Sequence, residues 1–343
     1  MAGRRRLLHV TAVLLLFAGI AVAILAIRAR AWLEAPIAAL DQPRPFEIER
    51  GASLTAVATQ LSRAGLLEHP RVFAWWARLT DQAAGVKAGE YLLTPGMSPS
   101  ALLELFNSGK VLLHAITFVE GMTFAEIRAL LAGHPAVGHD PSAVSDTELM
   151  TALGRPETFP EGQFFPDTYH FPRRTSDLEI LSIAHARMQS ELERAWENRA
   201  EDLPLANPYE ALILASIVEK ETGLDAERSI IAGVFVKRLR LGMRLQSDPT
   251  VIYGVRATFD GDLRRADLRQ DTPYNTYTRS GLPPTPIAAP GAASLAAAVR
   301  PDVTGALYFV ATGDGDGSHY FSDTLAEHEA AVRRYLRKLR ERG

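Results

Sequence analysis

A long apolar run near the N-terminus limits this chain more than any other feature. Residues 7–27, LLHVTAVLLLFAGIAVAILAI, contain no Asp, Glu, Lys or Arg. A helix of these 21 residues would be about 31 Å long, which matches the hydrocarbon thickness of a bilayer. Arginines lie on both sides of the run, at positions 4, 5, 6, 28 and 30. The sequence therefore predicts a transmembrane helix at 7–27 that follows a short tail, residues 1–6.

A cleaved signal peptide is the alternative interpretation of this run. Residues 21–23, Ala-Val-Ala, would offer a small-residue cleavage site, but that site lies inside the apolar run. The apolar part of a signal peptide is usually about 7–15 residues long, so an uncleaved anchor is favoured. The three arginines of the tail favour its retention in the cytoplasm. We therefore expect a single-pass protein of the cell inner membrane, in which everything after residue 30 lies outside that membrane.

Charge and cysteine content exclude several classes of protein. The chain has 37 basic and 40 acidic residues, but five of the basic ones flank the apolar run and no acidic residue precedes Glu34. Residues 31–343 therefore carry 32 basic against 40 acidic side chains, a net charge of −8, so no nucleic-acid partner is expected. The chain has no cysteine, which excludes a disulfide scaffold, a thiol nucleophile and a cysteine-ligated zinc site.

The segment after residue 45 has the pattern of a small β-α-α-β unit. The predicted order is strand, helix, helix and strand, at residues 46–50, 54–61, 70–79 and 89–93. Gly65 stands where a helix C-cap belongs, and Pro70 suits the first turn of the second helix. This order is the layout of small LysM-type glycan-binding modules, although any small α+β unit could share it.

The chain as a whole is expected to have an α+β fold. Its expected parts are the tail (1–6), the transmembrane helix (7–27), a polar, proline-containing linker (28–45), a LysM-like subdomain (46–115) and a larger mixed α+β domain that holds the candidate catalytic residues (116–343). Within the last part, residues 177–200 predict one long amphipathic helix with a structural role.

The most informative helix is ALILASIVEKETG, residues 211–223. On a helical wheel Glu221 lies within about 60° of three aliphatic residues, namely Leu214, Ile217 and Val218. Glu219 lies about 160° away from Glu221 on the same wheel, so it is expected to face water. The pattern therefore selects Glu221 as the buried carboxyl of this helix.

Glu221 also falls near the end of that helix, because Gly223 is the expected stop. The helix dipole disfavours a negative charge in the last turn, and burial disfavours it further. Both effects raise the pKa of a glutamate above its reference value of about 4.3, which suits a general acid. The alternative is a terminal glutamate that turns out of the core or pairs with an arginine.

Three further segments carry polar side chains in irregular surroundings. PEGQFFPDTYHF (160–171) holds Glu161 among aromatic residues, and LGMRLQSDPTVIYG (241–254) holds Gln246, Ser247 and Asp248. The third segment, NTYTRSGLPPTPIAAPG (275–291) with Tyr274 before it, is too rich in proline for a helix or a central strand. Together they predict an ordered surface of amide, hydroxyl and aromatic groups, although each alone would also fit a structural loop.

No metal or cofactor is expected. DGDG at 314–317 hints at a calcium loop, but the sixth position of that loop is His319 instead of Gly, so a hairpin turn between LYFVAT and HYFS is favoured. Glu327-His328-Glu329 lacks the spacing of a zinc-binding helix. The chain contains neither a G-x-S-x-G nucleophile elbow nor a phosphate-binding P-loop.

Five strings closely resemble those of the YceG-like family of endolytic murein transglycosylases. They are EGQFFPDTY (161–169), ASIVEKET (215–222), RLQSDPTVIYG (244–254), YNTYTRSGLPP (274–284) and LYFVATGDGDGSHYFSDTLAEHEAAV (307–332). The likeness covers roughly residues 46–338, and it is weakest at residues 136–158.

The resemblance implies that Glu221, the second Glu of the EKET string, is catalytic. The family reaction is non-hydrolytic, because the C6 hydroxyl of N-acetylmuramic acid attacks its own anomeric carbon and leaves a 1,6-anhydro end. Protonated Glu221 would donate to the leaving oxygen, and its carboxylate would then take the hydroxyl proton. The candidates for substrate binding are Glu161, Gln246, Ser247, Asp248, Tyr274, Asn275 and Tyr277.

The resemblance also implies the partners. They are the glycan strands of peptidoglycan and, around them, peptidoglycan synthases or the division and elongation complexes. A role in terminating glycan elongation would follow from cuts made within nascent strands.

Two other functions stay open at this point. The first is a muramidase-type hydrolase in the same site, with Glu161 or Asp248 as the second carboxylate that such enzymes use. The second is a non-catalytic peptidoglycan-binding protein that anchors a cell-wall synthesis complex. Anhydro ends, reducing ends or uncut strands would distinguish the three.

Overall fold

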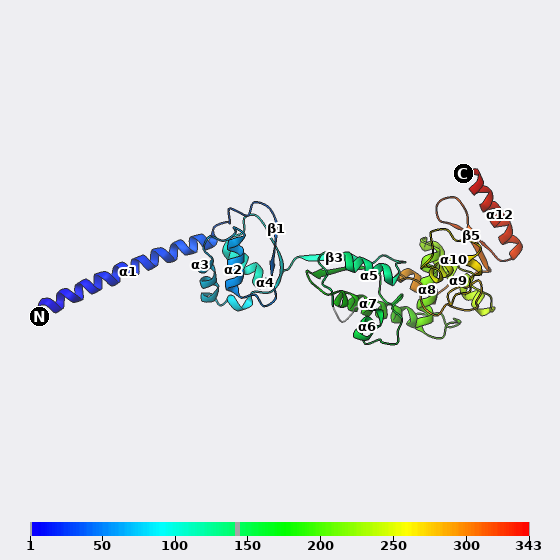
Figure 1. The fold of residues 1–343 in the computed structure, drawn as a ribbon, viewed down its shortest axis with the longest axis horizontal. Helices are drawn as coiled ribbons and strands as arrows, with labels where there is room; N and C mark the ends of the chain where they lie inside the picture. Colours follow the sequence, from blue (N-terminus) through cyan, green and yellow to red (C-terminus); the bar gives the residue numbers. More distant parts are fainter. Residues whose placement is uncertain (1, 141–144, 343) are drawn as a thin grey trace. The chain divides into compact units, whose positions relative to one another are not determined.

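The computed structural model describes residues 2–140 and 145–342 and has a mixed α+β fold (Figure 1). Its chain divides into two compact units, Met1–His114 and Ala115–Gly343. Part of the poorly matching segment 136–158, residues 141–144, lies outside the described residues.

The N-terminal helix α1 spans Ala2–Glu34 and is longer than the predicted apolar run. An 18-residue window within its stretch His9–Glu34 has a mean hydropathy of 2.9, and the stretch is long enough to cross a bilayer, a measure that a signal sequence would also meet. Residues 28–34, expected in the linker, continue the helix, and Arg30 forms an i,i+4 ion pair with Glu34 at 3.0 Å. Leu33 is buried, so the end of α1 packs against the rest of its unit.

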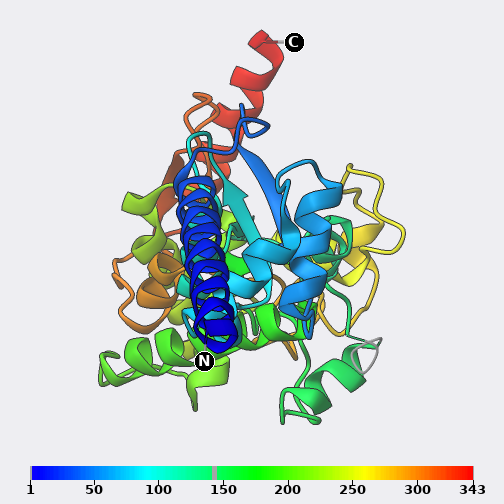
Figure 2. The same ribbon diagram turned by 90° about the vertical axis from the view of Figure 1, so that its left-hand side faces the viewer.

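The first unit contains the predicted β-α-α-β order. Its elements after α1 are β1 (Arg44–Ile48), α2 (Leu54–Arg63), α3 (Pro70–Leu79), the short 3₁₀ helix η1 (Ala83–Gly85), β2 (Gly89–Leu93) and α4 (Pro99–Ser108). The two strands pair antiparallel, with Phe46 opposite Tyr91, and lie side by side in Figure 2.

The ends of these helices follow from local chemistry. The Ser53 side chain accepts a hydrogen bond from the Ala56 N–H at 3.2 Å, as an N-cap does, and Pro70 opens α3. Gly65 has a φ of +76° just after α2, a conformation that a residue with a side chain rarely adopts. The core of the unit joins strands and helices through Phe46, Leu61, Phe73, Tyr91 and Phe106.

The second unit begins with a small α+β layer. Its elements are β3 (Leu113–Thr117), α5 (Phe124–Gly133), α6 (Asp146–Ala152), β4 (Thr168–Pro172) and α7 (Asp177–Glu197). Strands β3 and β4 pair, and α7 corresponds to the predicted long amphipathic helix. One face of α7 is buried in the core that this layer encloses, through residues such as Ile180, Leu181 and Ala184.

A helical core completes the second unit. It consists of α8 (Pro208–Glu221), α9 (Asp225–Arg240), α10 (Asp248–Gly254), the 3₁₀ helix η3 (Asp267–Arg269) and α11 (Ala292–Val299). Every residue from 211 to 218 in α8 is buried, because α7, α9, α10 and α11 pack around it. Helix α8 is therefore the centre of the unit.

The chain ends in a hairpin and a helix. Strands β5 (Tyr308–Ala311) and β6 (His319–Ser322) pair antiparallel, which confirms the hairpin predicted around DGDG. The last helix, α12 (Leu325–Arg342), packs against both strands.

Candidate active site

Helix α8 carries Glu221 at its last position. The helix begins after Asn207, whose side chain accepts from the Glu210 N–H at 3.0 Å, with Pro208 in the first turn. It ends because Thr222 is extended, with φ −147° and ψ 139°, one residue before the predicted stop at Gly223. Glu221 therefore lies in the last turn, where the helix dipole opposes a negative charge.

Glu221 is half-buried, and its carboxyl accepts a hydrogen bond from one neighbouring hydroxyl. The Ser247 hydroxyl donates to Oε1 of Glu221 at 2.5 Å. Burial is the main cause that raises the pKa of Glu221 to about 7, and the negative charge of Asp248 adds to the rise. The Ser247 hydrogen bond and the positive charge of Arg238 act in the opposite direction. The carboxyl can therefore hold a proton near neutral pH.

Glu221 opens into a cleft of about 540 Å³. One wall holds three of the predicted substrate-binding residues, Gln246, Asp248 and Tyr277. A second part of the lining, the second wall, comes from α9, the β5–β6 hairpin and α12, and it includes Arg238, Tyr308, Phe309, His319 and His328. Ser247 is buried beneath the first wall. Protein groups of both charge signs thus meet in one cleft beside the Glu221 carboxyl.

Hydrogen bonds join the start of α10 and the segment before it to the segment after η3. The Tyr277 hydroxyl donates to Oδ1 of Asp248 at 2.6 Å, and burial followed by this bond raises the Tyr277 pKa. The Ser247 N–H donates to the Thr276 hydroxyl at 3.0 Å, and Gln246 has a φ of +52° where the chain turns. Arg244 donates to the Tyr277 carbonyl at 3.0 Å. These contacts fix the wall that holds Asp248 and Tyr277.

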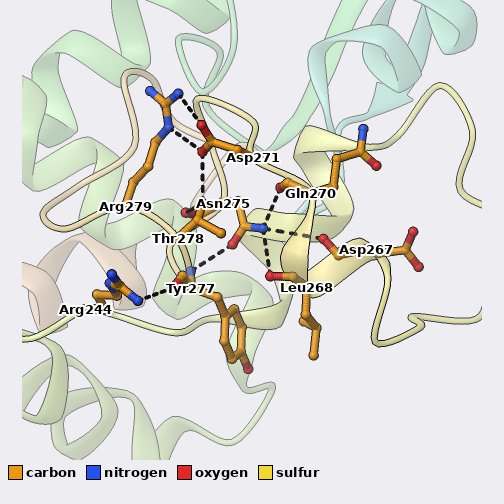
Figure 3. A network of polar contacts seen from close by, with 9 residues as sticks. All are labelled: Arg244, Asp267, Leu268, Gln270, Asp271, Asn275, Tyr277, Thr278 and Arg279. Atoms are coloured by element: carbon orange, nitrogen blue, oxygen red, sulfur yellow. Dashed lines mark hydrogen bonds and ion pairs between the residues drawn. The ribbon is translucent and has the colours of Figure 1, made fainter.

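Asn275 is buried behind this wall and does not line the cleft. Its side chain is fully buried (0% exposed). Its amide nitrogen donates to the carbonyls of Leu268 and Gln270 at 3.1 and 2.8 Å, while its oxygen accepts from the Tyr277 N–H at 2.8 Å (Figure 3). Because these bonds occupy the amide, the geometry gives Asn275 a structural role in place of the predicted substrate contact.

Glu161 and Tyr274 also lie outside the cleft lining. Glu161 is buried and accepts from the Phe124 N–H at 2.8 Å and from the Tyr253 hydroxyl at 2.9 Å. Burial raises its pKa, which the two hydrogen bonds and Arg256 partly offset. The Tyr274 ring packs edge-on against Tyr253, and its hydroxyl shares a hydrogen bond with Thr285 at 2.9 Å. The structure therefore places both residues in packing that supports the cleft.

The expectation that Glu219 faces water is wrong. The Glu219 side chain is only 6% exposed, and its Oε1 lies 3.9 Å from Nη2 of Arg228. Its Oε2 accepts a hydrogen bond from the Gly291 N–H at 2.9 Å. The helical wheel assumed one buried face, whereas α9 and α11 also cover the opposite side of α8. Glu219 therefore has a structural role, because its carboxylate contacts Arg228 and Gly291.

Two residues of the second wall were not among the site residues predicted from the sequence. Arg238 donates to the carbonyls of Leu307 at 2.7 Å and Leu245 at 2.5 Å, so it joins the hairpin to the segment that leads to Ser247. His319 has its backbone N–H and its Nδ1 at 3.0 and 2.7 Å from the Glu227 carboxylate. Their place in the cleft depends on contacts between distant segments, whereas the sequence of residues 307–322 predicts only a hairpin. Within residues 2–140 and 145–342, no three His, Asp or Glu side chains converge as a metal site would require.

Known proteins similar to this chain agree on one family. The model of the YceG-like family matches residues 46–334. A Bacillus subtilis (strain 168) protein named endolytic murein transglycosylase is 31% identical over 314 residues, which cover 87% of this chain and 86% of the relative. A Streptococcus pneumoniae (strain D39) protein of the same name is 27% identical over 325 residues, which cover 84% of this chain and 58% of the relative.

A solved structure gives the same result for the fold. The 2.6 Å crystal structure of a yceG-like protein from Listeria monocytogenes matches with a TM-score of 0.51 and 26% sequence identity. The match covers 84% of this chain and 99% of the Listeria chain.

Proposed function

This chain belongs to the YceG-like family, and on that premise we propose that it is a lytic transglycosylase that cuts murein with Glu221 as its acid. The observation that carries the proposal is the Glu221 carboxyl, which lines a cleft and has its pKa raised to about 7, chiefly by desolvation. The curated relatives are named endolytic murein transglycosylases, so the substrate proposed is a peptidoglycan strand.

One carboxyl is sufficient for the proposed reaction. Protonated Glu221 donates its proton to the glycosidic oxygen as the bond from that oxygen to C1 of N-acetylmuramic acid breaks. The C6 hydroxyl of the same sugar then forms a bond to C1, and its proton passes to the Glu221 carboxylate. The products are a 1,6-anhydro end and a free hydroxyl, and Glu221 returns to its protonated state. Because the nucleophile belongs to the substrate, its proximity replaces an activated water.

The groups around Glu221 have distinct proposed roles. Ser247 binds Oε1 of Glu221 at 2.5 Å and so fixes the direction of the carboxyl. Asp248 lines the cleft and would stabilise positive charge at C1 in the transition state. Gln246 and Tyr277 line the same wall and would hold the sugar. Asn275, Tyr274 and Glu161 would support this wall from beneath.

A hydrolase is the second candidate, because Asp248 supplies another carboxylate in the same cleft. Asp248 would then activate a water in place of the C6 hydroxyl. Glu161, the other candidate base, is buried away from the cleft lining and is hydrogen-bonded to Phe124 and Tyr253. The masses of the new glycan ends decide between an anhydro product and a reducing product.

The test of the proposed function is digestion of purified sacculi by the full chain in detergent, followed by mass analysis of the fragments. We expect 1,6-anhydro ends from the wild type and none from Glu221→Gln. Reducing ends would support the hydrolase. Uncut strands that still bind the protein would support a non-catalytic anchor.

The remaining parts of the chain complete the proposal. Helix α1 would be an uncleaved inner-membrane anchor that leaves both units in the periplasm. The β1-α2-α3-β2 unit would be LysM-like and bind glycan weakly. Cutting of nascent strands beside the membrane would terminate their elongation. The protein would act there together with peptidoglycan synthases or with the division and elongation complexes.

A further inference from the structure

One face of helix α3 is exposed although it carries two large apolar side chains. Trp75 and Leu79 are 59% and 61% exposed. Arg71 and Arg78 are exposed on the same side, because residues three, four, seven or eight positions apart lie on one face of a helix. The helix contains no acidic residue. Since tryptophan is highly buried in most proteins, the exposed face of α3, defined by these four residues, is a candidate interaction surface.

Helix α3 covers the side of the first unit from which α1 emerges (Figure 1). The Trp32 ring near the end of α1 has its centroid 5.2 Å from that of the His69 ring, and His69 is the residue before α3. Leu33 is buried, so the end of α1 belongs to the packed unit. Helix α2 packs against the buried face of α3 and lies farther from α1 in the figure. The exposed face of α3 is therefore directed toward the side on which α1 extends.

The length of α1 brings α3 close to the lipid headgroups. The apolar run ends at Ile27, and Leu33 follows it six positions later, which is about 9 Å along a helix. The headgroup layer on each side of a bilayer is about 5–8 Å thick, because a total thickness of about 40–45 Å encloses a hydrocarbon core of about 30 Å. With the apolar run in that core, the packed unit begins where the headgroups end. A helix that covers the membrane side of the unit then lies at the lipid surface.

The side chains of this face suit a lipid surface. Tryptophan is enriched at membrane interfaces because its ring is apolar but carries one polar N–H. A leucine such as Leu79 can enter the boundary between headgroups and acyl chains, and the arginines attract anionic headgroups. Arg78 also donates to the Thr55 hydroxyl at 2.9 Å, which holds its guanidinium at the surface of the unit. The same face of a second copy would bring arginine against arginine, which is repulsive.

We propose that the exposed face of α3 docks on the surface of the bilayer that α1 spans. Trp75 and Leu79 enter the interface, and Arg71 and Arg78 contact anionic headgroups. Together with α1, this contact holds the first unit against the membrane in one orientation. The inference rests on that part of the proposed function which makes α1 a membrane anchor.

The test uses a fluorescent probe on single cysteines, since the natural chain has none. Leu79→Cys reports on the exposed face of α3. Leu92→Cys is the matched control, because Leu92 is an exposed leucine of β2, and β2 pairs with β1, which lies across α2 from α3 (Figure 1). The full chain is placed, one copy per disc, in nanodiscs of phosphatidylethanolamine and phosphatidylglycerol. We expect a lipid-borne nitroxide to quench the probe at residue 79 but not at residue 92, and aqueous iodide to do the reverse.

The role of the arginines is tested in the same discs. Arg71→Gln, added to Leu79→Cys, should lower the ratio of docked to undocked probe by about 5-fold, the contribution of one basic side chain near anionic lipid. The ratio is read from the two fluorescence lifetimes. Lys110→Gln, an exposed residue between α4 and β3, should leave the ratio unchanged. In discs of phosphatidylcholine alone, Arg71→Gln should have no effect.

Two results would overturn the proposal. One is quenching by iodide that is as strong at residue 79 as at residue 92. The other is protection from iodide without quenching by the lipid nitroxide, which would show that protein covers the face. Leu16→Cys, in the apolar run, is read alongside them. Lipid quenching at residue 16 without quenching at residue 79 would overturn this inference alone, whereas no quenching at residue 16 would overturn the anchor as well. Cutting of sacculi is measured separately, so the proposed reaction can stand or fail independently.

Discussion

The Gly291 N–H donates a hydrogen bond to Oε2 of Glu219 at 2.9 Å. This bond joins the last turn of α8 to the residue that precedes α11. A Cβ at position 291 would lie 1.8 Å from Oε1 of Glu120, so a larger residue there would require the Glu120 side chain to move. Arg228 approaches the same carboxylate from α9. Glu219 thus ties two neighbouring helices to the turn that holds Glu221.

Glu219→Gln should destabilise the protein. The change leaves Arg228 buried with one fewer carboxylate near it, and it weakens the bond from Gly291. We expect the free energy of unfolding to fall by about 1–3 kcal/mol, measured by denaturant titration of the full chain in detergent. Glu193→Gln, on an exposed position of α7, is the matched control and should be neutral. Equal stability of the two variants would contradict the role given to Glu219.

Glu221→Gln should abolish cutting while the fold survives. The amide keeps the size of the side chain but has no proton to transfer, so the rate should fall by at least about 100-fold. Because Glu221 must be protonated to donate, wild-type activity should also decline as pH rises through about 7. The release of anhydro-muropeptides between pH 5 and 9, at a temperature at which both proteins are folded throughout, measures both effects. Near-normal activity of Glu221→Gln would remove Glu221 from the reaction.

The same variant should be more stable than the wild type above neutral pH. The Glu221 pKa is about 7 in the folded protein against 4.5 for the free side chain. Between these values the unfolded chain loses the proton and the folded chain keeps it, so wild-type stability falls as pH rises. Glu221→Gln has no such titration. We therefore expect its free energy of unfolding to exceed that of the wild type by about 1–3 kcal/mol, a difference that grows from pH 4.5 and levels off above 7. Parallel unfolding curves at pH 4 and pH 8 test it; a gain that is equal at both would contradict the raised pKa.

Two neighbours of Glu221 should shift the activity profile in opposite directions. Ser247 lowers the Glu221 pKa through its hydrogen bond, whereas Asp248 raises it through its charge. Ser247→Ala should therefore move the alkaline limb of activity to higher pH, and Asp248→Asn should move it to lower pH. Each shift is read from kcat/KM profiles, whatever the change in absolute rate. Shifts of the same sign would show that the limb does not report Glu221.

Helix α1 should remain attached in the mature protein. The apolar window of 18 residues within its stretch His9–Glu34 contains no buried residue. Protease added to spheroplasts should then degrade both units and leave the anchor protected. A shortened, soluble protein released on cell fractionation would indicate cleavage after a signal sequence.

Local patterns were sufficient to predict much of the fold. The cap at Ser53, the turn at Gly65 and the start at Pro70 place α2 and α3 as expected, because each depends on residues a few positions apart. The position of Glu221 in the last turn of α8 was likewise predictable from its neighbours.

Features that depend on distant segments could not be predicted in the same way. The burial of Glu219 needs Gly291 and Arg228, and the buried place of Asn275 needs the turn of chain after η3. A wheel or a motif contains no information on what covers a helix from the far side. For the same reason the sequence could not identify Arg238 and His319 as site residues. Their contacts join α9 to the hairpin segment, and the two are far apart in the chain.

The two walls of the cleft differ in how they resist opening. Residues 211–218 of α8 are all buried, so their amides should exchange with solvent only when the whole unit unfolds. The β5–β6 hairpin is mostly half-buried, so it should open at a smaller cost in free energy. Glu221 should thus lie on the more slowly exchanging of the two elements, and the hairpin should open before α8 does. Such a cleft could admit a polymer from the side, at an internal bond, without disordering the carboxyl proposed to cut it.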